Sequence, residues 1–424
     1  MSSSLPLSAK ARRTGEQPIS FLMVAAIANP KLINLAAGLV DPQTLPVAAV
    51  RQIAETLLSD PARGRAALQY DTTLGFTKLR KVALAHLEEL EQTSADQMSL
   101  TDRDILITTG SQQALYLVGD VLIDPGDIVI AANPCYFVYS GTLASLGATV
   151  LTVPMGPDGI DVPAIERLLE KLKQSGRLEF VKMIYTTSYF QNPTGLSMSA
   201  EGRRKLVEVV RRYSKERRIM ILEDAAYREL RYDGPALQSM KPLDDDNEFT
   251  ILTQTFSKPF APGLRTGYTA MPADLLEAVL HQKGNHDFGS ASLTQHIAAE
   301  ALTSGLYAKQ VRTLCENYRK KRDAMLAAMD KHLPASLGAT WTRPHGGLYV
   351  WVTLPKTIDA GRESALFRQC IERGVIYVPG EYSYQPDEFG IVAKNHLRLS
   401  FGQVDFNQIE PGIARFGEAL RSIA

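Results

Sequence analysis

The chain alternates short apolar, β-branched runs with amphipathic segments of helical period, and this alternation constrains the fold more than any other feature. The six apolar runs are 105–109, 128–132, 149–153, 181–187, 219–223 and 251–255. Most are continuous, as expected of strands buried on both faces. Between two of them, segment 201–218 has apolar side chains on one face and Arg and Lys on the other. The pattern predicts an α/β fold around a largely parallel sheet.

The pattern of predicted strands and helices changes in the last third of the sequence. A long helical segment is predicted over 302–332, and two alternating strands are predicted at 347–354 and 395–401. This mixture is typical of an α+β unit, so we expect a second, smaller domain there. Two charged runs, 319–322 and 244–246, are predicted to be a solvated helix face and a surface turn.

Length and charge favour a protein that acts on small molecules. The 424 residues are enough for two compact units. Lys plus Arg and Asp plus Glu number 46 each, so no basic excess indicates a nucleic-acid partner. Cys135, Cys315 and Cys370 form neither a disulfide framework nor a Cys-x-x-Cys pair, and the histidines show no metal-ligand spacing. We therefore expect no nucleic acid, no metal and a reducing compartment.

The N-terminal residues resemble a targeting signal in one respect. Lys10, Arg12 and Arg13 precede the apolar stretch 19–28, as basic residues precede the apolar part of a signal peptide. Pro18 stands at the join and the apolar stretch begins late, so an N-terminal helix that packs on the body of the fold is favoured. No uncharged apolar run approaches the roughly 18 residues of a membrane helix. We expect a cytoplasmic protein without a membrane partner.

Several common catalytic motifs are missing from the sequence. It contains no phosphate-binding loop of the G-x-x-x-x-G-K-[ST] type, no dinucleotide fingerprint after a strand and no G-x-S-x-G nucleophile elbow. Nucleotide hydrolases, nicotinamide enzymes and serine hydrolases are therefore disfavoured, and other residues must carry the chemistry.

Polar residues gather where predicted strands end. Gly110, Ser111 and Gln112 follow the first strand and open a helix, whose N–H groups suit a phosphate. A serine at this position is also an ordinary helix cap. Asp224 ends a strand with buried side chains, where a carboxylate is costly unless it meets a cation. The alternative for Asp224 is a loop aspartate that faces water.

A lysine and two arginines complete the set. Lys258 follows Thr255 and Ser257 and precedes Arg265. It is either a salt-bridge lysine or the amine of a Schiff base whose neighbours hold a phosphate. Arg398 stands in an apolar alternating strand, where a buried guanidinium needs a planar anion such as a carboxylate.

These residues together resemble a known family. Asn192 begins an Asn-Pro-Thr-Gly turn, which carries little information alone. A phosphate cradle, a Schiff-base lysine, a carboxylate for a pyridinium nitrogen and an arginine for a substrate carboxylate, however, meet the needs of pyridoxal 5′-phosphate acting on an amino acid. With these motifs the sequence resembles the fold type I, class I and II aminotransferases, over nearly the whole chain from 33–39 to Arg398.

Two stretches resemble one branch of that family. The segments 35–39 (Leu-Ala-Ala-Gly-Leu) and 344–351 (with a Gly-Gly-x-x-x-Trp pattern) are similar to the 2-aminoadipate, kynurenine and broad-specificity aminotransferases. Two positions depart from the family pattern. Ala225 stands where a second acid is frequent, and His345 stands where a small residue is frequent. Both leave the choice of substrate open.

The resemblance implies a role for each cofactor-binding residue. Lys258 would hold the cofactor covalently and act as the catalytic base, and Tyr136 would stack on the pyridine ring. Asp224 would pair with the ring nitrogen, while Asn192 and Tyr227 would bond the phenolic oxygen. The residues implied to hold the phosphate are Ser111, Gln112, Thr255, Ser257 and Arg265.

The resemblance also implies substrate contacts and an assembly. Arg398 would bind the carboxylate of the amino acid, with Asn192 and the Gly38 backbone nearby. Tyr70 resembles the family's tyrosine that reaches the phosphate of the neighbouring subunit, so the expected assembly is a homodimer with shared active sites.

The implied fold has three layers, with a mostly parallel sheet in a large cofactor-binding domain and a smaller α+β domain built from both ends of the chain. We expect the large domain over 46–305 and the small domain over 306–424. Segment 1–45 would join the small domain, and its first 29 or so residues would form a lid over a site that must accept two substrates.

The implied reaction moves the amino group of an L-amino acid to a 2-oxo acid, with 2-oxoglutarate expected. The resemblance implies an aromatic, branched or 2-aminoadipate-like donor, but the sequence does not name the amino acid. One alternative is another reaction on the same cofactor, such as that of a lyase, decarboxylase or synthase, because fold does not fix the reaction. A second is a non-catalytic regulator, which is disfavoured because only about 30 residues precede the first matched motif, too few for a DNA-binding domain.

Overall fold

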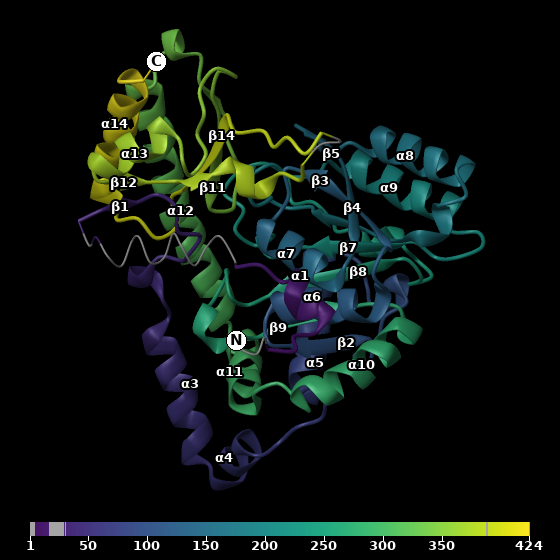
Figure 1. The fold of residues 1–424 in the computed structure, drawn as a ribbon. Coiled ribbons are helices and arrows are strands. Elements are labelled where there is room, and N and C mark those ends of the chain that lie inside the picture. The colour runs from purple at the N-terminus through teal and green to yellow at the C-terminus, as the bar shows by residue number, and fades with distance from the viewer. Residues whose placement is uncertain (1–4, 17–28, 30, 387–388, 424) are drawn as a thin grey trace.

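The computed structural model describes residues 5–16, 29, 31–386 and 389–423, and its centre is an eight-stranded sheet (Figure 1). In order across the sheet, the strands are β2 (Ile105–Thr108), β9 (Gly267–Ala270), β8 (Thr250–Thr255), β7 (Met220–Asp224), β6 (Val181–Thr187), β3 (Ile128–Asn133), β4 (Thr149–Gly156) and β5 (Gly159–Ile160). Only β9 and β5 run antiparallel to their neighbours. The predicted α/β fold with a mostly parallel sheet is confirmed.

Helices cover both faces of this sheet. One face carries α6 (Ser111–Leu122), α7 (Phe137–Leu146) and α10 (Ala273–Asp287), and the other carries α8 (Val162–Gln174) and α9 (Ala200–Tyr213). Along β3, Val129 and Ala131 pack with the first group, whereas Ile128 and Ile130 pack with the second. This alternation follows from the two-residue period of a strand, and it explains why the strand sequences are apolar throughout.

A second, four-stranded antiparallel sheet lies beside the large one. Its strands are β10 (Thr340–Trp341), β11 (Tyr349–Thr353), β14 (His396–Ser400) and β13 (Val378–Pro379). The helices packed near it are α12 (Leu306–His332), α13 (Ala365–Glu372) and α14 (Phe406–Arg421). A short strand, β1 (Ile33–Asn34), pairs with β12 (Val375–Ile376) and so brings an N-terminal segment against the C-terminal part of the chain.

Five further helices occur in the described residues. They are α1 (Ala9–Arg13), α3 (Val47–Ser59), α4 (Pro61–Leu68), α5 (Thr77–Glu91) and α11 (Ser292–Thr303). Of these, α5 and α11 contribute buried side chains to the largest core cluster. Helix α1 packs on α6 and α7, where Lys10 donates to Asp120 and Tyr116. Helices α3 and α4 extend away from the body (Figure 1). Across the described ranges, no helix combines the length and apolarity needed to cross a bilayer.

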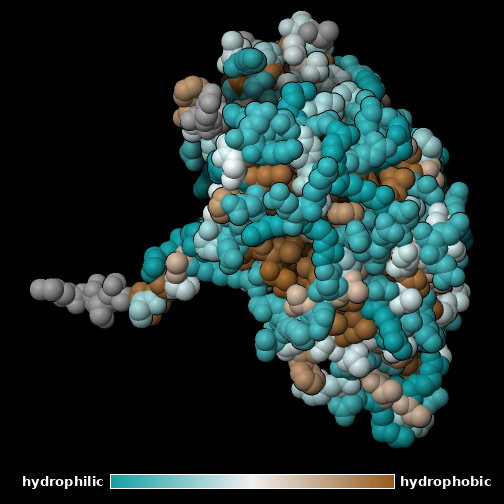
Figure 2. All heavy atoms as spheres, turned by 90° about the vertical axis from the view of Figure 1, so that its right-hand side faces the viewer, coloured by the Kyte–Doolittle hydropathy of each residue, from teal (hydrophilic) through white to brown (hydrophobic). Residues whose placement is uncertain are grey.

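The surface next to α8, α9 and α10 is largely hydrophilic. Figure 2 shows this face with a hollow in which apolar side chains are visible. Ahead of α1, Leu5 and Leu7 are exposed. The apolar stretch 19–28 and most of the predicted lid lie outside the described residues.

Two sequence predictions need correction in the C-terminal part. The helix predicted over 302–332 is interrupted, because α11 ends at Thr303 and α12 begins at Leu306 after Gly305, whose φ is 75°. The charged run within α12 is not wholly solvated. Lys321 is only 3% exposed and pairs with Asp41 at 2.7 Å, and Arg322 is buried beside Asp233. Acidic partners on distant segments allow these charges to be buried.

The acidic run 244–246 is also only partly a surface turn. Asp244 is fully buried. Its carboxylate accepts hydrogen bonds from the backbone N–H of Phe249 at 3.0 Å and of Thr250 at 2.8 Å, and it lies 3.8 Å from Nζ of Lys241. Asp244 therefore fastens the loop that leads into β8, and local sequence gave no sign of these partners.

Candidate active site

A pocket of about 290 Å³ lies at the carboxyl ends of the parallel strands. It is lined by the ends of β6, β7 and β8, the first turns of α6 and α7, the segment 37–39, and residues of β11 and β14. The predicted site residues that line it are Gly38, Ser111, Gln112, Tyr136, Asn192, Asp224, Tyr227, Thr255, Ser257, Lys258, Arg265 and Arg398. The fold thus brings together side chains from across the sequence, because strands that run in parallel end at one edge.

Lys258 lies in the pocket just after β8. Its Nζ donates to the carbonyl oxygen of Gly38 at 2.9 Å and stands 5.8 Å from the ring centre of Tyr227. Burial lowers the pKa of Lys258, and the guanidinium groups of Arg398 and Arg265 lower it further, against an opposing effect of Tyr349. The amine is therefore more readily neutral than an ordinary lysine, as a nucleophile or base must be.

Asp224 ends β7 on the floor of the pocket. Its carboxylate accepts hydrogen bonds from Oη of Tyr185 at 3.1 Å and from the N–H of Ala226 at 3.2 Å. Burial raises the pKa of Asp224 to about 6, against the opposing effect of these two donors and of Lys258. Within the described part of the chain, no cation forms an ion pair with this buried carboxylate. Such a group is suited to receive a positive charge from a ligand.

Hydroxyl and guanidinium groups meet the amino end of α6. Gly110, with a φ of 72°, precedes Ser111, the first residue of that helix. The N–H of Ser257 donates to Oγ1 of Thr255 at 3.1 Å, and Nη1 of Arg265 donates to Oγ of Ser257 at 3.3 Å. A Cβ on Gly110 would lie 2.9 Å from Nη2 of Arg265, so glycine is needed where this cation approaches the helix. A positive helix end beside an arginine binds anions.

Arg398 projects from β14 and is only 2% exposed. Its Nη1 donates to Oδ1 of Asn192 at 2.7 Å, and its Nη2 donates to the carbonyl oxygen of Ala36 at 2.8 Å. The guanidinium lies 4.3 Å from the ring centre of Tyr349. Its Nε is buried without a partner, and no described acidic side chain pairs with it. The charge of Arg398 is therefore left for an anionic ligand.

Two predicted tyrosines line the pocket. Tyr136 precedes the first turn of α7 and is half-buried, and Tyr227 is buried after β7. Burial raises the pKa of both phenols, so their hydroxyl groups stay protonated and can donate hydrogen bonds at neutral pH.

Tyr70 lies outside the pocket of its own chain. Its side chain is 80% exposed and meets the ring edge of Phe288, with 5.7 Å between the ring centres. Its predicted contact with a neighbouring subunit stays a prediction. Of the two departures from the family pattern, Ala225 is buried in the core, and His345 lies outside the pocket.

Several pocket residues received no role from the sequence. Tyr349, which appeared only as part of a motif, stands on β11 next to Arg398, because β11 and β14 pair in the register Tyr349↔Ser400 and Trp351↔Arg398. Tyr185 supports Asp224 from the neighbouring strand β6. Strand alternation could have placed Tyr185 on one face of the sheet, but the sequence does not state which strands are neighbours.

Comparison with known proteins identifies the family. A family model described as aminotransferase class I and II matches residues 30–416. The chain belongs to this family. It is a pyridoxal-phosphate-dependent enzyme of fold type I, and the resemblance seen in the sequence is confirmed.

Similar proteins include several aminotransferases. The aromatic-amino-acid aminotransferase 1 of Thermococcus litoralis is 34% identical over 92% of this chain and 88% of its own. The 2-aminoadipate transaminase of Thermus thermophilus is 32% identical over 93% of this chain and 91% of its own. The structure also superposes on a crystal structure of Pyrococcus horikoshii kynurenine aminotransferase, with a TM-score of 0.89 and 34% sequence identity. The match covers 99% of this chain and 97% of the other.

The side chains of this aminotransferase fit pyridoxal 5′-phosphate. Asp224 is a buried carboxylate that lacks a cation, which the ring nitrogen supplies when it is protonated. The close approach of Arg265 to Gly110 leaves an anion cradle at the start of α6. Lys258, with a lowered pKa, stands in the same pocket.

Proposed function

We propose that this aminotransferase moves the amino group of an aromatic or branched L-amino acid to 2-oxoglutarate. The observation that carries the proposal is one pocket that holds both Lys258 and the unpaired guanidinium of Arg398, beside apolar side chains. The apolar residues at this wall are Ala37, Leu39, Phe137 and Val138. A substrate fixed by its carboxylate at Arg398 would therefore meet an apolar surface.

A 2-aminoadipate-like donor makes the same demand on the pocket as 2-oxoglutarate, because both carry a second carboxylate. The cations of the described lining are Lys258, Arg265 and Arg398, and each already has a role in the proposal. The second carboxylate of either molecule would therefore have to stay at the solvent-exposed side of the pocket. Aromatic or branched donors make no such demand and would contact the apolar wall directly.

The proposed roles follow from the contacts. Bound pyridoxal phosphate supplies an electron sink that makes the α-proton of the amino acid removable. Asp224 would keep the ring nitrogen protonated, and Tyr136 would lie against the ring. Asn192 and Tyr227 would bond its phenolic oxygen. The residues proposed to hold the phosphate are Ser111, Gln112, Thr255, Ser257 and Arg265.

Two residues would act on the substrate directly. Arg398 would fix its carboxylate, with Asn192 and Gly38 adjacent. Lys258, whose pKa is lowered by its burial, would take the proton from Cα and return it to the adjacent carbon of the cofactor.

The acceptor must enter the same pocket after the first product leaves. Leu39 at its wall is 49% exposed, so the pocket opens to solvent on that side. The second carboxylate of 2-oxoglutarate would lie at this opening. Residues up to about 29 remain the proposed lid, since the segment that follows them supplies Gly38 and Leu39 to the wall.

We also propose a homodimer with shared sites. Leu68, Tyr70 and Phe288 are exposed apolar side chains, and Tyr70 contacts Phe288. Single exposed apolar residues are ordinary. Leu68 and Tyr70, however, lie at and just after the end of the projecting helix α4, and Tyr70 meets exposed Phe288 at the end of α10. This surface therefore favours a protein partner. A second copy that covers this group would place Tyr70 near the other phosphate site.

The domain division is likewise a proposal. Residues 46–305 contain the eight-stranded sheet, and residues 306–424 contain the four-stranded one. The pairing of β1 with β12 supports the assignment of segment 1–45 to the small domain.

Half-reaction spectra test the proposed reaction. An aromatic amino acid should convert the bound cofactor to its amino form, and 2-oxoglutarate should convert it back. A lyase, decarboxylase or synthase would not complete this reversible cycle, and a non-catalytic regulator would show no turnover. A panel of aromatic, branched and acidic donors, run against 2-oxoglutarate and an apolar 2-oxo acid, tests the substrate class separately.

A further inference from the structure

A second cavity, of about 600 Å³, shares the segment 189–197 with the active-site pocket. Asn192 faces the pocket, whereas Phe190 and residues 195–197 line the cavity. Its other walls are residues 228–237, one side of α12 and residues 343–345. None of the predicted site residues lines this cavity, so it is a separate space.

The floor of the cavity is apolar, and a hydrogen bond and close backbone packing fix its position. Half-buried Leu90, Leu196, Leu237 and Val311 line it together with the buried ring of Phe190. The N–H of Phe190 donates to Oγ of Ser197 at 2.9 Å. A Cβ on Gly346 would lie only 2.6 Å from the ring of Phe190, so the backbone packs directly on that ring.

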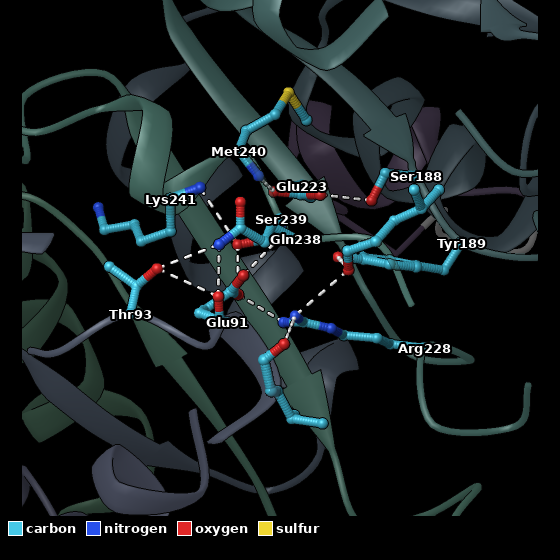
Figure 3. A network of polar contacts seen from close by, with 12 residues as sticks. Glu91, Thr93, Ser188, Tyr189, Glu223, Arg228, Gln238, Ser239, Met240 and Lys241 are labelled. Carbon is cyan, nitrogen blue, oxygen red and sulfur yellow. Dashed lines mark hydrogen bonds and ion pairs between the residues drawn. The ribbon is translucent and has the colours of Figure 1, made fainter. Parts of the chain in front are cut away.

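Apart from two arginines, the charged groups of the lining already have partners of opposite charge. Arg228 donates to Oε1 of Glu91 at 2.5 Å, and Figure 3 shows it within a network that also includes Tyr189. Glu229 lies 2.9 Å from Nε2 of His86. Asp233 pairs with Arg322. These groups have no free charge to offer to a ligand or to repel one.

The rim of the cavity carries free positive charge. Arg231 and Arg312 are exposed, and neither has an acidic partner among the residues that the structure describes. Arg231 donates only to the carbonyl oxygen of Gly234, at 2.7 Å. Arg343, by contrast, is paired with Asp330. Two guanidinium groups without an acidic partner among the described residues therefore line the exposed side of an apolar cavity.

We propose that this cavity is a second binding site, for a carboxylate that carries an aromatic body. Arg231 and Arg312 would bind the carboxylate, which matches the planar fork of a guanidinium. The apolar floor would cover the ring, as apolar walls do in ligand pockets of this size. A small inorganic anion would use the arginines alone and leave the floor bare.

Cys315 provides a reporter inside the cavity. Cys315 lines the cavity wall and is half-buried. Its Sγ lies 3.3 Å from the carbonyl oxygen of Glu229. Cys135 and Cys370 are buried. Burial raises the pKa of the Cys315 thiol to about 11, so alkylation of the holoenzyme by iodoacetamide is best followed at about pH 9, where more thiolate forms.

The test measures the rate of Cys315 alkylation with and without 3-phenylpropionate. At ten times its Kd this probe should slow labelling about tenfold, and the double variant Arg231→Gln with Arg312→Gln should abolish the protection. A charge-matched double variant of two exposed arginines elsewhere, Arg103→Gln with Arg167→Gln, should keep it. Peptide mapping assigns the label to Cys315.

Three results would overturn the proposal. Protection that persists in the double variant at Arg231 and Arg312 but disappears in Arg398→Ala would mean that the probe acts from the active site. Equal protection by inorganic phosphate would mean that the apolar floor plays no part. No protection at any soluble concentration of the probe would mean that the cavity does not bind it. The circular dichroism spectra of the variants should match that of the wild type. A loss of protection can then not be attributed to unfolding of the variant.

Discussion

The hydroxyl groups of Tyr227 and Tyr349 lie 2.8 Å apart. Tyr227 follows β7 in the large sheet, whereas Tyr349 begins β11 in the small one, so this hydrogen bond joins the two sheets across the active site. The ring of Tyr349 also lies 4.3 Å from the guanidinium of Arg398. A Cβ on Gly38 would come 2.4 Å from the Tyr349 hydroxyl. Tyr349 thus contacts three residues that we propose surround the cofactor and the substrate.

Two substitutions at Tyr349 separate its hydroxyl from its ring. Tyr349→Phe keeps the ring against Arg398, so the KM for both substrates should stay within about twofold. Tyr349→Leu removes the stacking, which is worth about 0.5–2 kcal/mol, and should raise both KM values about 2- to 30-fold. Steady-state kinetics of the two variants checks this. Equal KM values in wild type and Tyr349→Leu would show that the ring does not support the arginine.

The protonation of Asp224 predicts opposite changes in stability and activity. Its pKa is raised in the folded apoenzyme to about 6, so its ionisation destabilises the apoenzyme. The free-energy cost of ionising Asp224 is absent at pH values below its ordinary pKa near 3.8, and it is complete above about pH 6. At pH 8, apo Asp224→Asn should therefore be more stable than wild type by roughly 1–3 kcal/mol, and the difference should vanish toward pH 4.

Turnover should respond to Asp224→Asn in the opposite way. The amide cannot hold a proton on the ring nitrogen, so the loss should exceed about 100-fold, roughly 3 kcal/mol of transition-state stabilisation. Denaturant unfolding of the apoenzyme and kinetics of the holoenzyme check the two effects. Near wild-type turnover would exclude the proposed partnership.

Covalent attachment of the cofactor should depend on Lys258 alone. Lys258→Ala should lose the visible absorbance of the bound cofactor, and borohydride reduction followed by peptide mapping should mark Lys258. Two buried or half-buried lysines serve as internal controls, since Lys283 pairs with Asp287 at 2.8 Å and Lys182 lies 3.5 Å from Asp127. A label on either one would refute the assignment.

The sequence predicts the active site better than its surroundings. Motifs at strand ends predicted that Lys258 and Asp224 would share one pocket, because parallel strands that end at a common edge leave little freedom. Arg398 lies within a strand of the second, antiparallel sheet, and its place in the site was predicted only by the family resemblance. Tyr349 and Tyr185 received no role, because their place depends on which strands are neighbours. Periodicity finds strands, but long-range pairing sets the order in which they lie.

Charged runs were the least reliable signal. The run 319–322 reads as a solvated face, yet Lys321 is buried against Asp41, which lies 280 residues earlier in the chain. Asp244 is buried in the same way by backbone donors of the following loop. A charge is buried when partners compensate its desolvation, and those partners are known only after folding.

Substrate binding should depend on the two parallel hydrogen bonds that the guanidinium of Arg398 can donate to a carboxylate. A lysine cannot form two parallel bonds to a carboxylate. Arg398→Lys should therefore raise the KM for both the amino acid and the 2-oxo acid at a cost of about 1.5–3 kcal/mol, or about 10- to 150-fold. Because Arg398 also donates to Asn192 and Ala36, the melting temperature is measured beside KM. A large fall in Tm with unchanged KM would show that Arg398 serves stability only.

Complementation between two inactive chains tests the shared site. Lys258→Ala and Tyr70→Phe should each be inactive as homodimers, and Tyr70→Ala replaces the latter if the phenyl ring suffices. In a hybrid dimer, one site combines an intact Lys258 with the other chain's intact Tyr70. Random mixing makes half of the dimers hybrid with one working site each, so about a quarter of wild-type activity should return. No recovery despite proven subunit exchange, or a fully active monomer by sedimentation, would rule out the contribution of Tyr70 to a neighbouring site.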